Sequence, residues 1–195
     1  SEHAQISRIQ SALLAEEFVL YYQPKVDMRS GEVTGAEALI RWQHPEQGLL
    51  PPGEFLPLID NTDTIATLGD WVIGEALRQM SEWQKQGLTL PVSVNIAARQ
   101  LQAPNFVARL QELLSLHRQL PPSWLELEIV ETAALDDVIE VSNIIRNCQA
   151  LGVSFALDDF GTGYSSLTYF KRLPARTLKI DQSFIRDMLV VPEDL

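Results

Sequence analysis

The adjacent aspartates Asp158 and Asp159 form the part of the chain best suited to chemistry. They end an apolar segment and precede a loop rich in glycine and hydroxyl groups, in the sequence ALDDFGTGYSSL over residues 156–167. Neighbouring carboxylates at the end of a strand repel each other unless a positive group lies close to both. A metal ion is the usual group of this kind, so the segment indicates a functional site rather than a packed core.

Polar side chains also interrupt four other apolar segments at the spacing of a strand. Side chains alternate between the two faces of a strand, so the polar residues of one segment share a face. These residues are Glu37 and Arg41 in the first segment, Asn95 in the second, Glu126 and Glu128 in the third, and Lys179 in the fourth. In a parallel barrel such groups meet at the carboxyl ends of the strands, where the active sites of that fold lie.

The candidate ligands all offer oxygen atoms. They are Glu37, Asn95, Glu128, Asp158 and Asp159, with the cation Lys179 beside them. Oxygen ligands favour hard divalent cations such as Mg²⁺ or Mn²⁺ over zinc, which sulfur and imidazole bind well. Four carboxylates carry more charge than one divalent ion neutralises. We therefore expect a pair of ions about 3.5–4 Å apart, an arrangement that suits in-line displacement at phosphorus.

The elements that must position these residues alternate between strands and helices. Strands are expected over 18–26, 33–42, 92–96, 125–130, 153–158 and 177–181, helices over 6–17, 54–61, 65–86, 105–117, 136–150 and 165–173, and a loop over 44–53. This alternation is typical of a parallel α/β fold. The first two strands add an antiparallel hairpin that turns at Ser30 and Gly31.

A (β/α)8 TIM-like barrel is the expected form of this α/β fold. No glycine-rich nucleotide motif follows the first strand, which counts against a doubly wound sheet. Barrels of this type take roughly 250 residues, whereas the chain has 195. We therefore expect a barrel that is incomplete at its C-terminus.

The composition excludes several classes of partner. Hydrophobic residues make up 46% of the chain and the formal net charge is −11, which indicates a globular domain that binds neither nucleic acid polymer nor anionic membrane through bulk charge. Cys148 is the single cysteine of the sequence, so a disulfide framework is excluded and a cytoplasmic setting is favoured. No apolar run approaches the roughly 18 residues of a membrane span. We expect a cytoplasmic protein, or the cytoplasmic domain of a membrane-anchored one.

At these residues the chain resembles the EAL domain family, named after the tripeptide that stands here as Glu37-Ala38-Leu39. Six blocks carry the resemblance in order, over residues 22–26, 37–42, 92–95, 128–132, 158–167 and 178–181. The resemblance implies a barrel with one antiparallel strand, and the hydrolysis of cyclic di-GMP to linear pGpG in bacterial second-messenger and biofilm signalling. It implies two divalent cations, Mg²⁺ or Mn²⁺, with Ca²⁺ inhibitory. The domain is then expected over residues 18–195, without the last two strands of the family, after an N-terminal helix or linker over 1–17.

The resemblance also implies roles for individual residues. The implied metal ligands are Glu37, Asn95, Glu128, Asp158 and Asp159. The implied catalytic residues are Glu37, Asp158, Asp159 and Lys179, the last of which orients the attacking water. The implied substrate-binding residues are Arg41, which holds a phosphate, with Leu39 beside it, and Gln23. The loop 160–166 is expected to link metal occupancy to a homodimer contact, and family members adjoin a sensor or a diguanylate cyclase-like domain.

Other functions stay open from the sequence alone. One is a catalytically silent receptor for cyclic di-GMP, although such members usually lack the glutamate of the tripeptide or the aspartate pair. Another is an inactive fragment, if the missing strands are needed. A barrel glycosidase with paired carboxylates is a third, which Asn95 and Lys179 suit less well than a metal site. Glu37 and Glu128 are alternatively structural ion-pair partners, with Lys179 as one candidate cation.

Overall fold

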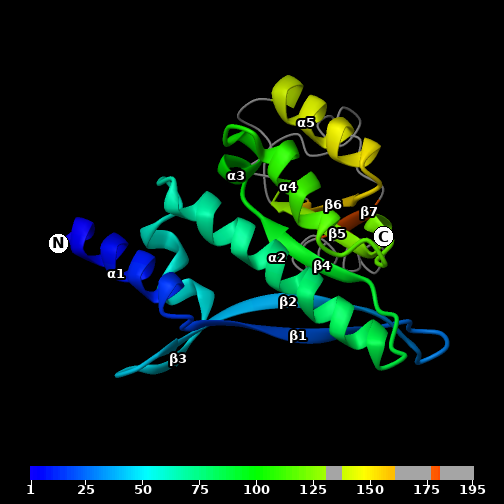
Figure 1. Ribbon diagram of the computed structural model, residues 1–195, viewed down its shortest axis with the longest axis horizontal. Coiled ribbons are helices and arrows are strands. Elements are labelled where there is room, and N and C mark those ends of the chain that lie inside the picture. The colour runs from blue at the N-terminus through cyan, green and yellow to red at the C-terminus, as the bar shows by residue number, and fades with distance from the viewer. Residues whose placement is uncertain (131–137, 161–176, 181–195) are drawn as a thin grey trace, which may run out of the picture.

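A mixed sheet of seven strands organises the described part of the chain (Figure 1). The computed structural model describes residues 1–130, 138–160 and 177–180. The strands lie in the order β1-β2-β4-β5-β6-β7, and β3 pairs with β2 outside this path. Their bounds are β1 Phe18–Val26, β2 Val33–His44, β3 Gly48–Leu50, β4 Val92–Ile96, β5 Leu125–Val130, β6 Ser154–Phe160 and β7 Thr177–Ile180.

Strand direction divides the sheet into an antiparallel and a parallel part. β1 and β2 form an antiparallel hairpin, and β3 is a second antiparallel neighbour of β2. From β2 through β4, β5, β6 and β7, all neighbouring strands are parallel. The predicted parallel α/β architecture with an antiparallel opening hairpin is therefore confirmed for the described residues.

Helices connect the parallel strands and pack on one face of the sheet. Their bounds are α1 Glu2–Leu14, α2 Thr64–Lys85, α3 Ala98–Gln102, α4 Phe106–Ser115 and α5 Val138–Ala150. Val72 and Ile73 of α2 share the main core with Val94 of β4 and Leu127 of β5. Because side chains alternate along a strand, burial of this apolar face directs the intervening polar residues to the opposite face. No helix in the described ranges combines the length and the hydrophobicity that a membrane span requires.

The segment between β2 and α2 differs from the expected loop and helix. The expected loop over 44–53 contains β3, whose Leu50 pairs with Trp42 of β2. The helix expected over 54–61 is wrong: the chain forms two 3₁₀ turns, Pro52–Glu54 and Leu56–Leu58. Each turn contains a proline near its start, and a residue without an N–H cannot extend the hydrogen-bond ladder of a longer helix. The helix expected over 165–173 lies outside the described residues.

The N-terminal helix α1 docks against the start of the sheet. Ile9 and Ala12 are buried in a second core with Phe18 of β1 and Trp42 of β2. Arg8 donates two hydrogen bonds to the Glu17 carboxylate, at 2.7 and 3.0 Å. The helix begins four residues earlier than expected because the Ser1 side chain accepts a hydrogen bond from the backbone of Ala4 and caps the first turn.

Gly152 forms the tight link between α5 and β6, and its backbone requires glycine. Its φ is +98°, and an added Cβ would lie 3.1 Å from the Pro122 Cβ. We expect Gly152→Ala to lower the free energy of unfolding by about 1–2 kcal/mol, the cost of a left-handed backbone for an L-residue. Gly53→Ala is the matched control, since nothing lies within 4 Å of its added Cβ, and it should change stability by under about 0.5 kcal/mol. Urea denaturation measures both, and equal losses would contradict the strain at Gly152.

Candidate active site

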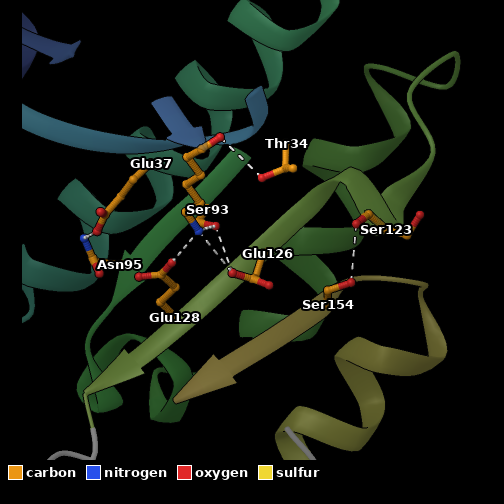
Figure 2. Close-up of polar contacts among 9 residues, drawn as sticks. Thr34, Glu37, Ser93, Asn95, Ser123, Glu126, Glu128 and Ser154 are labelled. Carbon is orange, nitrogen blue, oxygen red and sulfur yellow. Dashed lines mark hydrogen bonds and ion pairs between the residues drawn. The ribbon is translucent and has the colours of Figure 1, made fainter. Parts of the chain in front are cut away.

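Strand pairing brings the polar side chains of β2, β4 and β5 into rows across the sheet. Glu37 pairs with Ser93, and Ser93 pairs with Glu126. Two residues further along the strands, Asn95 pairs with Glu128. Paired residues of neighbouring strands point to the same face, so all five side chains lie on the face opposite the helices. Figure 2 shows this grouping.

Glu37 and Asn95 are in direct contact. The Asn95 Nδ2 donates a hydrogen bond of 3.2 Å to Glu37 Oε1 (Figure 2). Asn95 is the exposed residue of β4, whose other four residues are buried. A polar side chain that is exposed near the carboxyl end of a buried strand is available to a ligand at this end of the sheet. Because the amide nitrogen faces Glu37, the amide oxygen of Asn95 is left to accept a further bond or to coordinate a cation.

Glu128 is buried in this polar face, with 0% of its side chain exposed. Its Oε1 accepts a hydrogen bond of 3.1 Å from Lys25 Nζ. Lys25 lies on β1 and is separated from Glu128 by 103 residues of sequence. A carboxylate removed from water is stable in its charged form only with a cation and hydrogen bonds around it. The antiparallel strand thus supplies a counter-charge for a residue of the parallel sheet.

Ser93 and Glu126 extend this ion pair into a four-residue network, the Lys25 network (Lys25, Ser93, Glu126 and Glu128). Lys25 Nζ also donates to Ser93 Oγ and lies 3.6 Å from Glu126 Oε1. Ser93 Oγ in turn donates a hydrogen bond of 2.8 Å to the same Glu126 oxygen. In Figure 2, Ser93, Glu126 and Glu128 point toward one another from β4 and β5.

Sequence reasoning missed most of this network. Lys25 and Ser93 are not among the predicted site residues, and Glu126 was expected only as a same-face neighbour of Glu128. A signal existed for Ser93 and Glu126, because each precedes a predicted ligand by two residues and so shares its face. No local signal links Lys25 to Glu128. Lys25 is a cation that the structure describes at Glu128. The suggested partner Lys179 stays a prediction, because its side chain lies outside the described part of the structure.

The aspartate pair lies within β6, which continues to Phe160 and not only to Asp158 as expected. The backbone of Asp158 pairs with Val130 at the carboxyl end of β5. Lys179 lies in the neighbouring strand β7. The side chains of Asp158, Asp159 and Lys179 are outside the described part of the structure, as is the loop that follows Phe160, so their roles remain predictions.

The predicted substrate-binding residues lie along the first two strands. The Arg41 guanidinium donates to the Ile40 carbonyl over 2.8 Å and lies 5.9 Å from the centre of the Tyr21 ring. Gln23 is exposed and pairs with Glu37 across the hairpin. These positions bring Arg41 and Gln23 to the same two strands as Glu37, without a direct side-chain contact to it among the described residues.

A cavity of about 250 Å³ adjoins the Glu37–Asn95 contact, between the middle of β2, the end of β4 and the first turns of α2. Leu39 and Asn95 contribute to its lining, together with apolar side chains such as Leu68. Asp60 adds a carboxylate to the same lining, and burial raises its pKa. A mostly apolar cavity with a few polar groups is typical of a small-molecule site.

The donor atoms of the described site fit a hard divalent cation. Glu37, Asn95 and Glu128 offer carboxylate and amide oxygens from three adjacent strands, and Mg²⁺ and Mn²⁺ prefer such ligands. Among the side chains that the structure describes, which do not include those of Asp158 and Asp159, no three or more acidic, histidine or cysteine residues form a group that could hold an ion. The sequence predicts Asp158 and Asp159 as the further ligands of such a site.

Comparison with known proteins places the chain in a family. The family model described as the EAL domain matches residues 6–194. The chain therefore belongs to the EAL domain family.

Its relatives include proteins named for cyclic di-GMP. MucR of Pseudomonas aeruginosa, named a bifunctional diguanylate cyclase/cyclic di-GMP phosphodiesterase, is 44% identical over 181 residues, which are 92% of this chain and 26% of MucR. PdeR of Escherichia coli, named a cyclic di-GMP phosphodiesterase, is 40% identical over 183 residues, which are 93% of this chain and 27% of PdeR. The chain spans about a quarter of the length of these relatives.

A solved structure shows the same fold. The PaMucR phosphodiesterase in its c-di-GMP complex matches with a TM-score of 0.86 and 43% identity, over 95% of this chain and 75% of that chain. The predicted TIM-like barrel class is confirmed by this likeness.

We expect Lys25→Met to lower the free energy of unfolding by about 3 kcal/mol, the low end of the cost of breaking a buried ion pair, because Lys25 itself is partly exposed. Lys85→Met is the matched control, since Lys85 pairs with Glu82 at 3.1 Å on the exposed surface of α2. Surface pairs contribute about 0–1 kcal/mol. Urea denaturation followed by circular dichroism compares the free energies of unfolding of the two variants. An equally small change in both would show that the Lys25 pair adds little stability.

Proposed function

We propose that this chain is the catalytic domain of a metal-dependent phosphodiesterase that hydrolyses cyclic di-GMP to linear pGpG. The observation that carries the proposal is the array of Glu37, Asn95 and Glu128 on one face of three adjacent strands in a member of the EAL domain family. The names of MucR and PdeR support the substrate. The oxygen donors support Mg²⁺ or Mn²⁺ as the cofactor.

Five residues would hold two divalent cations: Glu37, Asn95, Glu128, Asp158 and Asp159. The chemistry that two bound cations supply is the activation of water at neutral pH and the neutralisation of charge on the phosphate. Asn95 turns its amide nitrogen to Glu37, which leaves its oxygen for coordination.

The remaining site residues act on the substrate. Arg41 holds a phosphate oxygen through its guanidinium, which suits this geometry. Lys179 orients the water that attacks phosphorus, and the phosphorus–oxygen bond to one ribose breaks as the new bond forms. Leu39 and the cavity beside it provide an apolar surface for a purine base, and Gln23 pairs with Glu37, two residues before Leu39 on β2.

The proposal extends to the setting of the chain. We expect it to act in the bacterial cytoplasm, as a homodimer, beside a sensor or a diguanylate cyclase-like domain. The bifunctional name of MucR, of which the match covers 26%, supports a neighbouring cyclase domain.

The direct test is an assay of the purified protein with cyclic di-GMP, in which chromatography follows pGpG. We expect pGpG with Mg²⁺ or Mn²⁺ and inhibition by Ca²⁺, whose larger and looser coordination suits this chemistry poorly. Glu37→Ala should lower kcat at least about 100-fold, because it removes a ligand and the acceptor of the Asn95 hydrogen bond.

Glu75→Ala is the control for this loss, since Glu75 pairs with Arg78 on the outer side of α2, and it should keep kcat within about twofold. An unchanged kcat in Glu37→Ala would show that Glu37 is not a metal ligand. If the protein binds cyclic di-GMP but forms no pGpG, it is a catalytically silent receptor and not an enzyme.

Arg41→Ala should raise KM for cyclic di-GMP about tenfold or more, because a charge-assisted hydrogen bond to phosphate is lost. Among the described residues no carboxylate pairs with Arg41, whereas Arg78 is held by Glu75 at 2.6 Å. Arg78→Ala is therefore the matched control and should leave KM unchanged. Steady-state kinetics separate the two, and an unchanged KM in Arg41→Ala would exclude a phosphate contact.

A further inference from the structure

We propose that Lys25 is a positioning residue that sets the orientation of Glu128 toward a divalent cation. The inference rests on the proposed function, in which Glu128 is a metal ligand, and adds a role to a residue that binds neither metal nor substrate. It is carried by the geometry of the Lys25 network, which joins the antiparallel strand β1 to β4 and β5.

Lys25 approaches Glu128 from the amino-terminal ends of the parallel strands. Its backbone pairs with Gly35, two residues before Glu37 on β2. Ser93 and Glu126 are the second residues of β4 and β5, whereas Asn95 and Glu128 are the fourth. Lys25 therefore lies below the row that holds Asn95 and Glu128, on the side away from the carboxyl ends where a ligand would bind.

This placement constrains one oxygen of Glu128. The Lys25 contact of 3.1 Å occupies Oε1 from below. Rotation of the carboxylate about its last bond would therefore break the ion pair of a glutamate whose side chain has no exposed surface. When a second-shell partner fixes the direction of a ligand, less conformational entropy is lost as the metal binds.

Ser93 and Glu126 hold the lysine in turn. Ser93 Oγ accepts from Lys25 and donates to Glu126 at 2.8 Å, while Glu126 also lies 3.6 Å from the Lys25 nitrogen. Lys25 thus has partners from two strands besides Glu128, and its ammonium is not free to follow the carboxylate. Glu126 gives this support without belonging to the predicted ligand set.

A purely electrostatic role makes the opposite prediction. A positive charge near a bound cation repels it, so removal of Lys25 would tighten metal binding if its charge were all that mattered. If Lys25 positions Glu128, its removal weakens metal binding, and so does the removal of the neutral hydroxyl of Ser93. Ser93→Ala therefore separates the two explanations, because it changes no charge.

The test is calorimetric titration of the full chain with Mn²⁺, with Lys25→Met, Lys25→Arg, Ser93→Ala and the surface control Lys85→Met. We expect Lys25→Met to weaken Mn²⁺ binding about tenfold, the low end of the range for second-shell partners. Ser93→Ala should weaken it less, about threefold, because Ser93 acts on Glu128 through Lys25. Lys25→Arg should restore affinity to within about threefold of the original, because a charged donor is retained. Lys85→Met should bind Mn²⁺ as the unmodified chain does.

Kinetics with cyclic di-GMP give a second readout. Lys25→Met should lower kcat and leave KM for cyclic di-GMP unchanged at saturating Mn²⁺, since Lys25 does not contact the substrate. Circular dichroism establishes that each variant is folded. If Lys25→Met does not fold, Ser93→Ala and Lys25→Arg carry the test.

Two results would overturn the proposal: tighter or unchanged Mn²⁺ binding in folded Lys25→Met, or unchanged binding in Ser93→Ala. Both are distinguishable from a failure of the proposed function. An unmodified chain that binds Mn²⁺ but releases no pGpG would refute the phosphodiesterase, while weaker Mn²⁺ binding in Lys25→Met would still support the positioning role.

Discussion

The burial of the Glu128 carboxylate is the constraint on which the rest of the site depends. A carboxylate with no exposed surface is costly inside a sheet unless a cation and hydrogen-bond donors lie against it. Lys25 meets this need at 3.1 Å, and Ser93 and Glu126 hold the lysine from neighbouring strands. The antiparallel strand β1 is therefore more than the edge of a sheet, because it carries the charge that allows an acidic residue to lie inside the polar face.

One face of the sheet packs in the hydrophobic core and the other carries the polar residues of the site. Apolar residues such as Val94 and Leu127 pack against α2 in the main core, and the residues between them, including Asn95 and Glu128, point the other way. Packing on the helical face fixes the register of the strands, and register in turn aligns Glu37 with Ser93 and Asn95 with Glu128. A one-residue slip would move every polar group to the core face, so the site and the core are stabilised by the same strand pairing.

Sequence patterns predicted the long elements well and the short ones poorly. The bounds of β1, β4 and β5 agree with the expected ranges, because each has a clear alternation or apolar run. The strand β3 and the short helix α3 were not expected: β3 has three residues and the five residues of α3 make little more than one helical turn, so neither repeats its period. The helix expected over 54–61 was wrong: Pro57 lies inside this range without an N–H to donate, and the chain forms 3₁₀ turns instead.

The sequence alone determined the family, the alternation of strands and helices, and the face on which each polar residue of a strand must lie. These properties are local or cumulative along the chain, and so they can be recognised without coordinates. Only the tertiary structure decided which charges meet. Lys25 and Glu128 are 103 residues apart, and no pattern in either segment predicts that the two side chains are in contact. Their contact exists because β1 folds back on β2 while β4 and β5 add in parallel, which brings the side chains of distant strands onto one polar face of the sheet.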